Sequence, residues 1–378
     1  MAGELLTADD SSMARRRDYL RLALVYGVGP RLMASLLDYF ETPSEVLAAS
    51  RTQLNEVARV GPKLADAICK ARHDDLVDRV IEHCEVHAVR ILIPDDDEFP
   101  SLLKEIADPP LLLFIRGELK SEDQLSIGIV GTRHATHYGR VVAEGLARSL
   151  ARAGLTIVSG LARGIDAYAH RAAMEVGGRT IAFLGSNVTD VYPAEHSDLA
   201  EEIIMHGAVI SETEPFNKPK AGVFPKRNRL ISGISLGVII VEAAQRSGAL
   251  ITATHAGEQG RDIFAVPGPV NSRMSQGCNR LIRDGAILIQ DAQDVLEHLG
   301  PLFESVQVAP DRIVRNPIEL KLNEQEQSVL QAIETVPSDL DEVIVRSGLT
   351  VSRVLSTVSA LEMRGLIRRV GGRSVQRT

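Results

Sequence analysis

The sequence has few of the residues that build disulfide frameworks or metal sites. Its three cysteines, Cys69, Cys84 and Cys278, lie far apart and show no CxxC or Cys/His spacing. Neither His134 nor His137 extends to a recognisable metal-ligand pattern, so we expect no metal. A chain with an odd number of scattered cysteines is typical of a reducing compartment, and we expect a cytoplasmic protein.

Long apolar runs are also absent. No stretch of 18 consecutive apolar residues occurs, which argues against a membrane span. Arginines 15–17 are followed by apolar residues that Tyr19, Arg21 and Gly27 interrupt, unlike the continuous apolar region of a signal peptide. The net charge of −8 argues against a histone-like coat, so any nucleic-acid binding has to come from a local basic patch.

The 378 residues, 44% hydrophobic and 24% charged, suit a globular protein of two or three domains. Short helical patterns fill residues 18–86, separated by the turns Gly27–Pro30 and Val60–Lys63, each of which places proline near the start of a helix. In the first helix after such a turn, Leu32, Leu36 and Phe40 share one face. We expect a small all-α domain over residues 1–86.

The middle of the chain has a different rhythm. Short apolar runs begin near residues 127, 156, 180, 208, 237, 262 and 286, and each precedes a helical pattern. Continuous apolar strands that alternate with helices predict a parallel sheet covered on both faces. The sequence therefore predicts a doubly wound, Rossmann-like α/β domain with a mostly parallel sheet over residues 87–300.

After a predicted linker at 301–320, three short helical patterns precede a two-strand ribbon with Gly371-Gly372 at its turn. This order predicts a winged helix-turn-helix over residues 321–378. Arginines 364, 368, 369, 373 and 377 crowd the wing without an acidic residue, which favours phosphate contact. The predicted recognition helix, however, has Arg353 as its only cation, so an accessory or protein-contacting role is the alternative.

Glycine turns follow the first strands of the predicted sheet. Gly131-Thr132-Arg133 ends the first strand, where loop N–H groups and a helix N-terminus favour anions. Gly160 and Arg163 follow the second strand, and Gly185 follows the third. The first turn departs from GxGxxG and no suitably placed acid follows, which argues against a dinucleotide cofactor. A tight turn with a solvated arginine is the alternative.

Two residues of the second turn allow a catalytic interpretation. Asp166 and His170 stand at i and i+4 of the next helix and could form an acid/base pair. The simpler interpretation is a helix cap together with a hydrogen bond on the helix face. Across the predicted sheet edge no nucleophile is paired with a base, so we expect no enzyme activity and no cofactor.

A basic segment lies between the fourth and fifth of these strands. Residues 216–229 hold five cations, no acid, and the aromatic residues Phe216 and Phe224. Cations neutralise phosphates while aromatic rings stack on bases of any identity, so this segment is typical of single-strand binding. A solvated charge run is the alternative. Ser247, Gly248 and Asn279 follow later strands and line the same predicted edge.

Successive segments resemble one family. IGIVGTR, IVSGLARGID, FLGSNVTDVYP, ISETEP, FPKRNRLISG, SGALITA, EQGRDIFAVPG and SQGCNRLIRDGA, which follow one another between residues 126 and 286, are similar to the signature blocks of the DprA (Smf) family. The resemblance implies an extended Rossmann-like domain that binds single-stranded DNA without sequence preference, protects it and helps to load the RecA recombinase in natural transformation. It also implies a homodimer through these domains, and it fits a helix-hairpin-helix or SAM-like module before them and a winged helix after them.

The resemblance assigns phosphate contacts to Arg133, Lys226, Arg227 and Arg229, with Phe224 and Asn228 shaping the site. The other expected contacts share the same sheet edge: Gly131, Gly160, Arg163, Gly185, Ser247, Gly248 and Asn279. A weaker, secondary contact is expected from the wing: Arg368, Arg369 and Arg373.

Two rivals from other classes stay open. One is a nucleotide phosphoribohydrolase, whose PGGxGTxxE-like site this chain lacks, because Glu242 precedes Ser247-Gly248-Ala249 without the double glycine. The other is a transcription regulator that senses a nucleotide in the sheet and reads DNA with the tail. A regulator prefers one duplex sequence, whereas a DprA-like protein takes any single strand.

Overall fold

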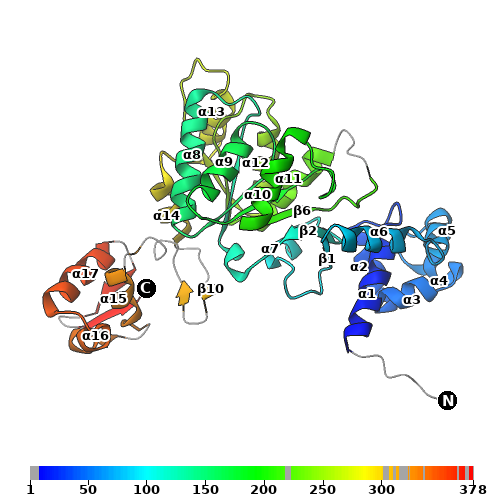
Figure 1. Ribbon diagram of the computed structural model, residues 1–378, viewed down its shortest axis with the longest axis horizontal. Helices are drawn as coiled ribbons and strands as arrows, with labels where there is room; N and C mark the ends of the chain where they lie inside the picture. The colour runs from blue at the N-terminus through cyan, green and yellow to red at the C-terminus, as the bar shows by residue number, and fades with distance from the viewer. Residues whose placement is uncertain are drawn as a thin grey trace.

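The computed structural model describes residues 8–217, 223–300, 306–309, 312–314, 322, 324–334, 337–363, 366–370 and 374–377. Six helices form the N-terminal module (Figure 1): α1 (Ala8–Ala23), α2 (Pro30–Phe40), α3 (Pro43–Ala48), α4 (Arg51–Glu56), α5 (Pro62–Ala71) and α6 (Leu76–Val86). Gly29 and Gly61 are the N-cap residues of α2 and α5, and proline follows each of them, as the two turns predict.

A sheet of nine strands forms the centre of the molecule. Its strands are β1 (Arg90–Leu92), β2 (Leu113–Gly117), β3 (Ser126–Val130), β4 (Thr156–Ser159), β5 (Thr180–Phe183), β6 (Gly207–Ser211), β7 (Gly237–Ile240), β8 (Asp262–Ala265) and β9 (Ile287–Leu288). The order is β1-β2-β6-β5-β4-β3-β7-β8-β9, and only the pairs β1–β2 and β2–β6 are antiparallel. The predicted mostly parallel, doubly wound sheet is confirmed.

The strand order reverses beside β3. From β3 the chain builds outward through β4, β5 and β6, and then returns to place β7 on the other side of β3. Loops on either side of such a reversal run in opposite directions and leave a crevice at the carboxyl ends of the strands. The topology thus fixes where a ligand site belongs, between the loops that follow β3 and β7.

Helices cover both faces of the sheet (Figure 1). One face packs Ile127, Ile129 and Ile157 against α8 (His137–Arg152), α9 (Ile165–Met174) and α14 (Ala292–Leu299). The other face packs Val130, Val158 and neighbouring strand residues against α7 (Ser101–Lys104), α11 (Val223–Ile234), α12 (Gly248–Glu258) and α13 (Gln276–Arg283). Because both faces are buried, the central strands are mostly apolar, as the sequence indicates.

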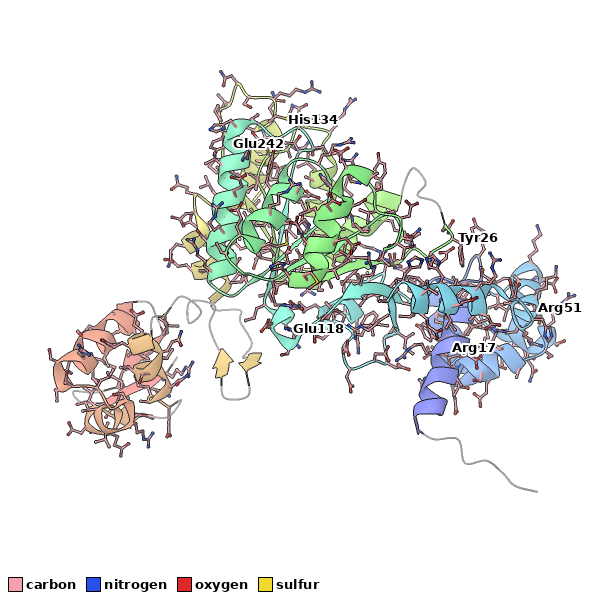
Figure 2. All side chains as sticks on the ribbon, in the orientation of Figure 1. Arg17, Tyr26, Arg51, Glu118, His134 and Glu242 are labelled. Atoms are coloured by element: carbon pink, nitrogen blue, oxygen red, sulfur yellow. The ribbon has the colours of Figure 1, made fainter. Side chains whose placement is uncertain are left out.

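The N-terminal module shares a core with the sheet. Val77 and Val80 of α6 belong to the same apolar cluster as Leu199 and Ile203 of α10 (Ser197–His206) and Val209 of β6. Ion pairs add to this docking, because Arg16 of α1 contacts Asp96 of the loop after β1 at 2.7 Å. The module, whose side chains Figure 2 shows with Arg17, Tyr26 and Arg51 labelled, is therefore packed onto the edge of the sheet rather than tethered to it.

The C-terminal part has the predicted winged-helix order. It contains α15 (Glu324–Gln331), β12 (Ser338–Asp339), α16 (Leu340–Ser347), α17 (Val351–Met363), β13 (Ile367–Arg369) and β14 (Ser374–Arg377), with β14 between the other two strands. Within the predicted linker, β10 (Val306–Ala309) and β11 (Arg312–Val314) form a two-stranded antiparallel sheet that the sequence did not predict. In the described parts of the chain, no helix has the length and apolar character needed to cross a membrane.

Candidate nucleic-acid interface

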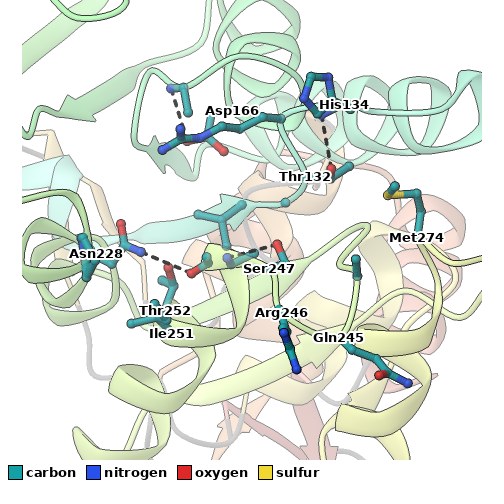
Figure 3. Close-up of a pocket in the computed structure, with 18 of the residues that line it drawn as sticks. Thr132, His134, Asp166, Asn228, Gln245, Arg246, Ser247, Ile251, Thr252 and Met274 are labelled. Atoms are coloured by element: carbon teal, nitrogen blue, oxygen red, sulfur yellow. Dashed lines mark hydrogen bonds between the residues drawn. The ribbon is translucent and has the colours of Figure 1, made fainter. Parts of the chain in front are cut away.

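A pocket of about 730 Å³ opens at the carboxyl ends of the strands, where the strand order reverses (Figure 3). Its walls come from the loops after β3, β4, β7 and β8 and from the first turns of α11 and α12. Thr132 and His134 approach it from the loop after β3, and Gln245, Arg246 and Ser247 from the loop after β7. The observed pocket is at the place that the topology of open α/β sheets favours for ligands.

Positive charge surrounds this pocket. Arg133, Arg246 and Arg273 are exposed lining residues that follow β3, β7 and β8. Within the described residues, no carboxylate forms an ion pair with Arg246 or Arg273, and Asp166 is the one acidic side chain of the lining. We refer to Arg133, Arg246 and Arg273 as the arginine rim. Three cations from three strand ends, with little opposing charge, favour an anionic ligand.

The N-terminus of α12 adds backbone donors to the same wall. Ser247 is its N-cap, and the hydroxyl oxygen accepts a hydrogen bond from the Ala249 N–H at 3.3 Å. A Cβ atom on Gly248 would meet no atom within 4 Å, so the backbone there is open to a ligand. Helix N-termini with accessible N–H groups bind phosphate through their partial positive charge.

A buried pair of opposite charges forms the floor. The Arg227 guanidinium donates to the carbonyl oxygens of Gly160, at 2.6 Å, and Phe183. The Asp166 carboxylate accepts from the N–H groups of Gly160, at 3.1 Å, and Ala162, at 3.4 Å. Burial lowers the pKa of Arg227 to about 10, although the negative charge of Asp166 acts in the opposite direction. Burial also raises the pKa of Asp166. Arg227 thus bridges the ends of β4 and β5.

Glycine is required at two of the predicted positions because other groups approach closely. A Cβ on Gly160 would lie 2.5 Å from two nitrogens of the Arg227 guanidinium, and a Cβ on Gly131 would lie 2.5 Å from the Ile165 side chain. Gly160 therefore makes room for the buried cation, and Gly131 lets the loop after β3 pass against α9. The predicted Gly185 is buried, and its carbonyl accepts from the Thr213 hydroxyl at 3.3 Å.

The predicted cations divide into two groups. Arg133 lines the pocket, and Lys226 is exposed on α11. Arg229 is 5% exposed and pairs with Glu212 at 2.6 Å and with Asp108 at 3.2 Å. Its geometry places it in the framework of the protein, whereas Arg227 is buried at the floor of the pocket, where carbonyl oxygens hold its guanidinium. The sequence alone cannot distinguish the exposed cations Arg133 and Lys226 from the buried Arg227 and Arg229, because all four stand in basic or glycine-rich segments.

Other predicted residues brace loops near the pocket. Asn228 lines it and donates to the Gly248 carbonyl at 3.3 Å, which connects α11 to α12. Asn279 exchanges two hydrogen bonds with the backbone of Gly268, at 2.9 and 3.2 Å. Arg163 is exposed and forms a two-bond ion pair with Glu195 at 2.6 Å. The side chain of Phe224 lies outside the described residues.

On the wing, Arg368 donates to Gln376 at 3.0 Å, and Arg369 pairs with Glu362 of α17 at 3.0 Å. Arg373 lies outside the described residues. The α17 helix exposes the apolar side chains of Val351 and Leu355. Exposed apolar residues on this helix fit the protein-contacting interpretation better than base reading.

Two members of the arginine rim were missed as site residues. Arg246 stands directly before the predicted Ser247-Gly248, and Arg273 lies in the loop after β8. A usable signal was present, since each is a cation in the segment between a strand and the next helix of a parallel sheet. The Arg273 loop is far in sequence from the glycine turns after β3, β4 and β5, so its position at the pocket could not be inferred from them.

The carboxylate of Glu242 holds the start of α8 in place. It accepts hydrogen bonds from the N–H and the hydroxyl of Thr136, at 2.9 and 2.6 Å, and Thr136 caps α8. A Cβ on Gly139 would lie 2.1 Å from a Glu242 oxygen, so the carboxylate is enclosed by the start of this helix. Glu242 therefore lacks the open position that the phosphoribohydrolase interpretation needs.

The proposed acid/base pair is not formed. Gly164, and not Asp166, is the N-cap of α9, and the Asp166 carboxylate turns back to the preceding loop. His170 is buried, with Nδ1 2.7 Å from the Thr180 hydroxyl oxygen. That hydroxyl donates to the Ile157 carbonyl at 2.7 Å, so Nδ1 carries the proton of a neutral imidazole and Nε2 has no partner among the described residues.

Acid should destabilise the protein through His170. Burial, followed by nearby positive charge, lowers its pKa from 6.5 to about 3. Below pH 6.5 the imidazole binds a proton in the unfolded state but stays neutral in the folded state. The free energy of unfolding therefore falls as the pH drops below the pKa of the unfolded state. Between pH 7 and pH 5 this group should cost about 2 kcal/mol. Urea unfolding at both pH values measures it, and an equal loss of stability in His170→Gln would contradict the assignment.

Known proteins identify the architecture. A family model described as DNA recombination-mediator protein A matches residues 90–300. Models of the DprA winged helix domain and of a SAM-like helix-hairpin-helix tandem match residues 314–373 and 19–74. The chain belongs to the DprA family.

DprA relatives align with most of the chain. Protein Smf of Synechocystis is 34% identical, over 95% of this chain and 98% of its own length. The crystal structure of DprA from Streptococcus pneumoniae superposes with a TM-score of 0.65 at 33% identity and covers 74% of this chain and 96% of its own. DprA from Helicobacter pylori, whose structure is described as showing a single-stranded DNA binding mode, has a TM-score of 0.51 at 32% identity, over 56% and 95%.

Proposed function

We propose that this DprA family member binds single-stranded DNA without sequence preference along the carboxyl edge of its sheet. The observation that carries the proposal is the arginine rim, three exposed cations around a pocket that also receives the N-terminus of α12. A phosphodiester backbone presents regularly spaced anions to such a rim, and neutralising them releases counterions. No base-specific set of donors is needed for this kind of binding.

The floor of the pocket supports a binding role rather than a catalytic one. Asp166 is buried against backbone N–H groups, and Arg227 is held by two carbonyls. The Ser159 hydroxyl lies within hydrogen-bond reach of Asp166, but this serine is buried and donates to the Ile129 carbonyl at 2.6 Å. An acyl- or glycosyl-transfer site requires a nucleophile that the substrate can reach, and among the described residues neither Asp166 nor Arg227 is paired with one. The arrangement instead provides a rigid base for the loops that carry Arg133 and Arg246.

Two further parts of the proposal rest on the family resemblance. The protein hands its bound strand to the RecA recombinase, and it acts as a homodimer through the Rossmann-like domains. Support comes from the family description, a DNA recombination mediator. The exposed apolar residues of α17 make the winged helix a candidate for protein contact in this exchange.

Binding of a labelled, mixed-sequence single strand and of its duplex, across a salt series, tests the proposed function. We expect the single strand to bind more tightly and its affinity to fall steeply as salt rises, because phosphate contacts release counterions. Several unrelated sequences should bind alike. Preference for one duplex sequence would instead support the transcription-regulator interpretation. An affinity that does not change with salt would show that the protein does not bind DNA through its phosphates.

A further inference from the structure

An exposed aromatic ring marks a second feature of the sheet edge. Phe216 follows β6 and remains 44% exposed, although most large apolar side chains of the α/β domain are buried. It stands at the start of the basic segment 216–229 and at the carboxyl edge that also carries the arginine rim. An exposed phenylalanine costs stability relative to a buried one, so its position calls for a reason.

Two side chains of α6 contact the Phe216 ring. The guanidinium carbon of Arg79 lies 5.1 Å from the Phe216 ring centroid, and the His83 ring meets Phe216 edge-on at 5.3 Å. The rings of His83 and His87 are 4.2 Å apart. Because residues 79, 83 and 87 are spaced at i, i+4 and i+8, they form one column along the helix. A cation and three flat rings thus lie together.

Buried hydrogen bonds hold the arrangement in place. The amide of Asn187 donates to the Pro215 carbonyl at 2.9 Å, directly before Phe216. The amide oxygen accepts from the N–H and the hydroxyl of Thr189, both at 2.9 Å. The Thr189 hydroxyl oxygen lies 3.1 Å from Nε2 of His83. Asn187 therefore fixes the Phe216 turn and, through Thr189, the ring that packs against it.

We propose that Phe216, braced by Arg79 and His83, is a stacking platform for an unpaired nucleobase. The inference rests on the proposed function and extends it to the N-terminal module, which supplies two of the three side chains. Three strand spacings separate β6 from β3, roughly 14 Å, which is the reach of a few nucleotides. A strand whose phosphates lie on the arginine rim can therefore place a base on Phe216, and stacking accepts any base.

The chain contains no tryptophan, so one introduced tryptophan would be its only source of indole fluorescence. Phe216→Trp creates a single reporter whose indole can still stack. We expect its fluorescence to be quenched when a mixed-sequence single strand binds, with affinity retained. Tyr39→Trp is the matched control, since Tyr39 is a similarly exposed ring of the helical module, held by Phe40 and Glu56. Equal responses of the two reporters would overturn the proposal.

Binding measurements separate stacking from phosphate contact. Phe216→Ala should weaken binding of a mixed-sequence strand by about 5- to 100-fold, and Phe216→Tyr should preserve it. On an abasic strand of equal length and charge, the alanine variant should match the wild type. Wild-type affinity of Phe216→Ala for the base-containing strand overturns the platform and leaves the proposed function standing. Failure of the wild type to bind any single strand rejects the proposed function itself.

Discussion

Replacing Arg133 and Arg246 together with alanine should weaken binding of single-stranded DNA by at least about 100-fold, because each charge-assisted contact contributes about 1.5–3 kcal/mol. Both side chains line the pocket from adjacent strand ends, on either side of the reversal in strand order. The slope of log affinity against log salt should also become shallower by about 1.4, which corresponds to two lost phosphate contacts on a single strand. Fluorescence anisotropy across a salt series measures both quantities.

A matched control removes the same charge elsewhere. Arg148 and Arg152 lie in the last two turns of α8, at the end of that helix remote from the pocket. Their double alanine variant has the same net charge as the rim variant, so it accounts for any effect of the overall field. If the two double variants lose affinity equally, the arginine rim is not the binding surface.

Replacing Arg227 with alanine should produce a different result, a loss of roughly 3–5 kcal/mol in the free energy of unfolding, because the partner charge stays buried. Arg227 is only 6% exposed, and its guanidinium donates to carbonyls at the ends of β4 and β5. Without it, Asp166 loses a nearby positive charge that favours its ionised form, and two carbonyl oxygens lose their donor. Chemical unfolding monitored by circular dichroism measures the loss.

The double variant Arg227→Met with Asp166→Asn separates charge from packing. It removes both buried charges and retains most of the volume, so it should be more stable than Arg227→Ala. Stability of Arg227→Ala close to the wild type, accompanied by weakened DNA binding, would show that Arg227 contacts phosphate as the family motif implies. The two roles are therefore distinguishable in one protein.

Periodicity in the sequence was enough to predict the alternation of strands and helices in the parallel part of the central sheet. The apolar runs near residues 127, 156 and 180 correspond to β3, β4 and β5, because strands buried on both faces are mostly apolar. The glycine turn at Gly131 likewise predicted the end of the sheet at which the pocket opens. Such features depend on local chemistry, which neighbouring residues reveal.

Side-chain direction could not be predicted in the same way. Lys226, Arg227 and Arg229 stand within four positions of one another, yet the first is exposed and the other two are buried. The partners that decide this, Gly160 and Glu212, lie 67 and 17 residues away in the chain. Arg273 joins the rim for the same reason, since only the completed sheet brings its loop beside Arg133.

The shared core of the N-terminal module and the sheet affects how this protein can evolve. Val80 of α6 and Ile203 of α10 are buried in one apolar cluster that the module and the sheet domain build together, so separating the two parts would expose apolar side chains to water. A genetic event that exchanged or removed the module would have to rewrite the outer face of α10 at the same time. The boundary that a sequence comparison draws near residue 90 is thus a poor place for recombination between genes.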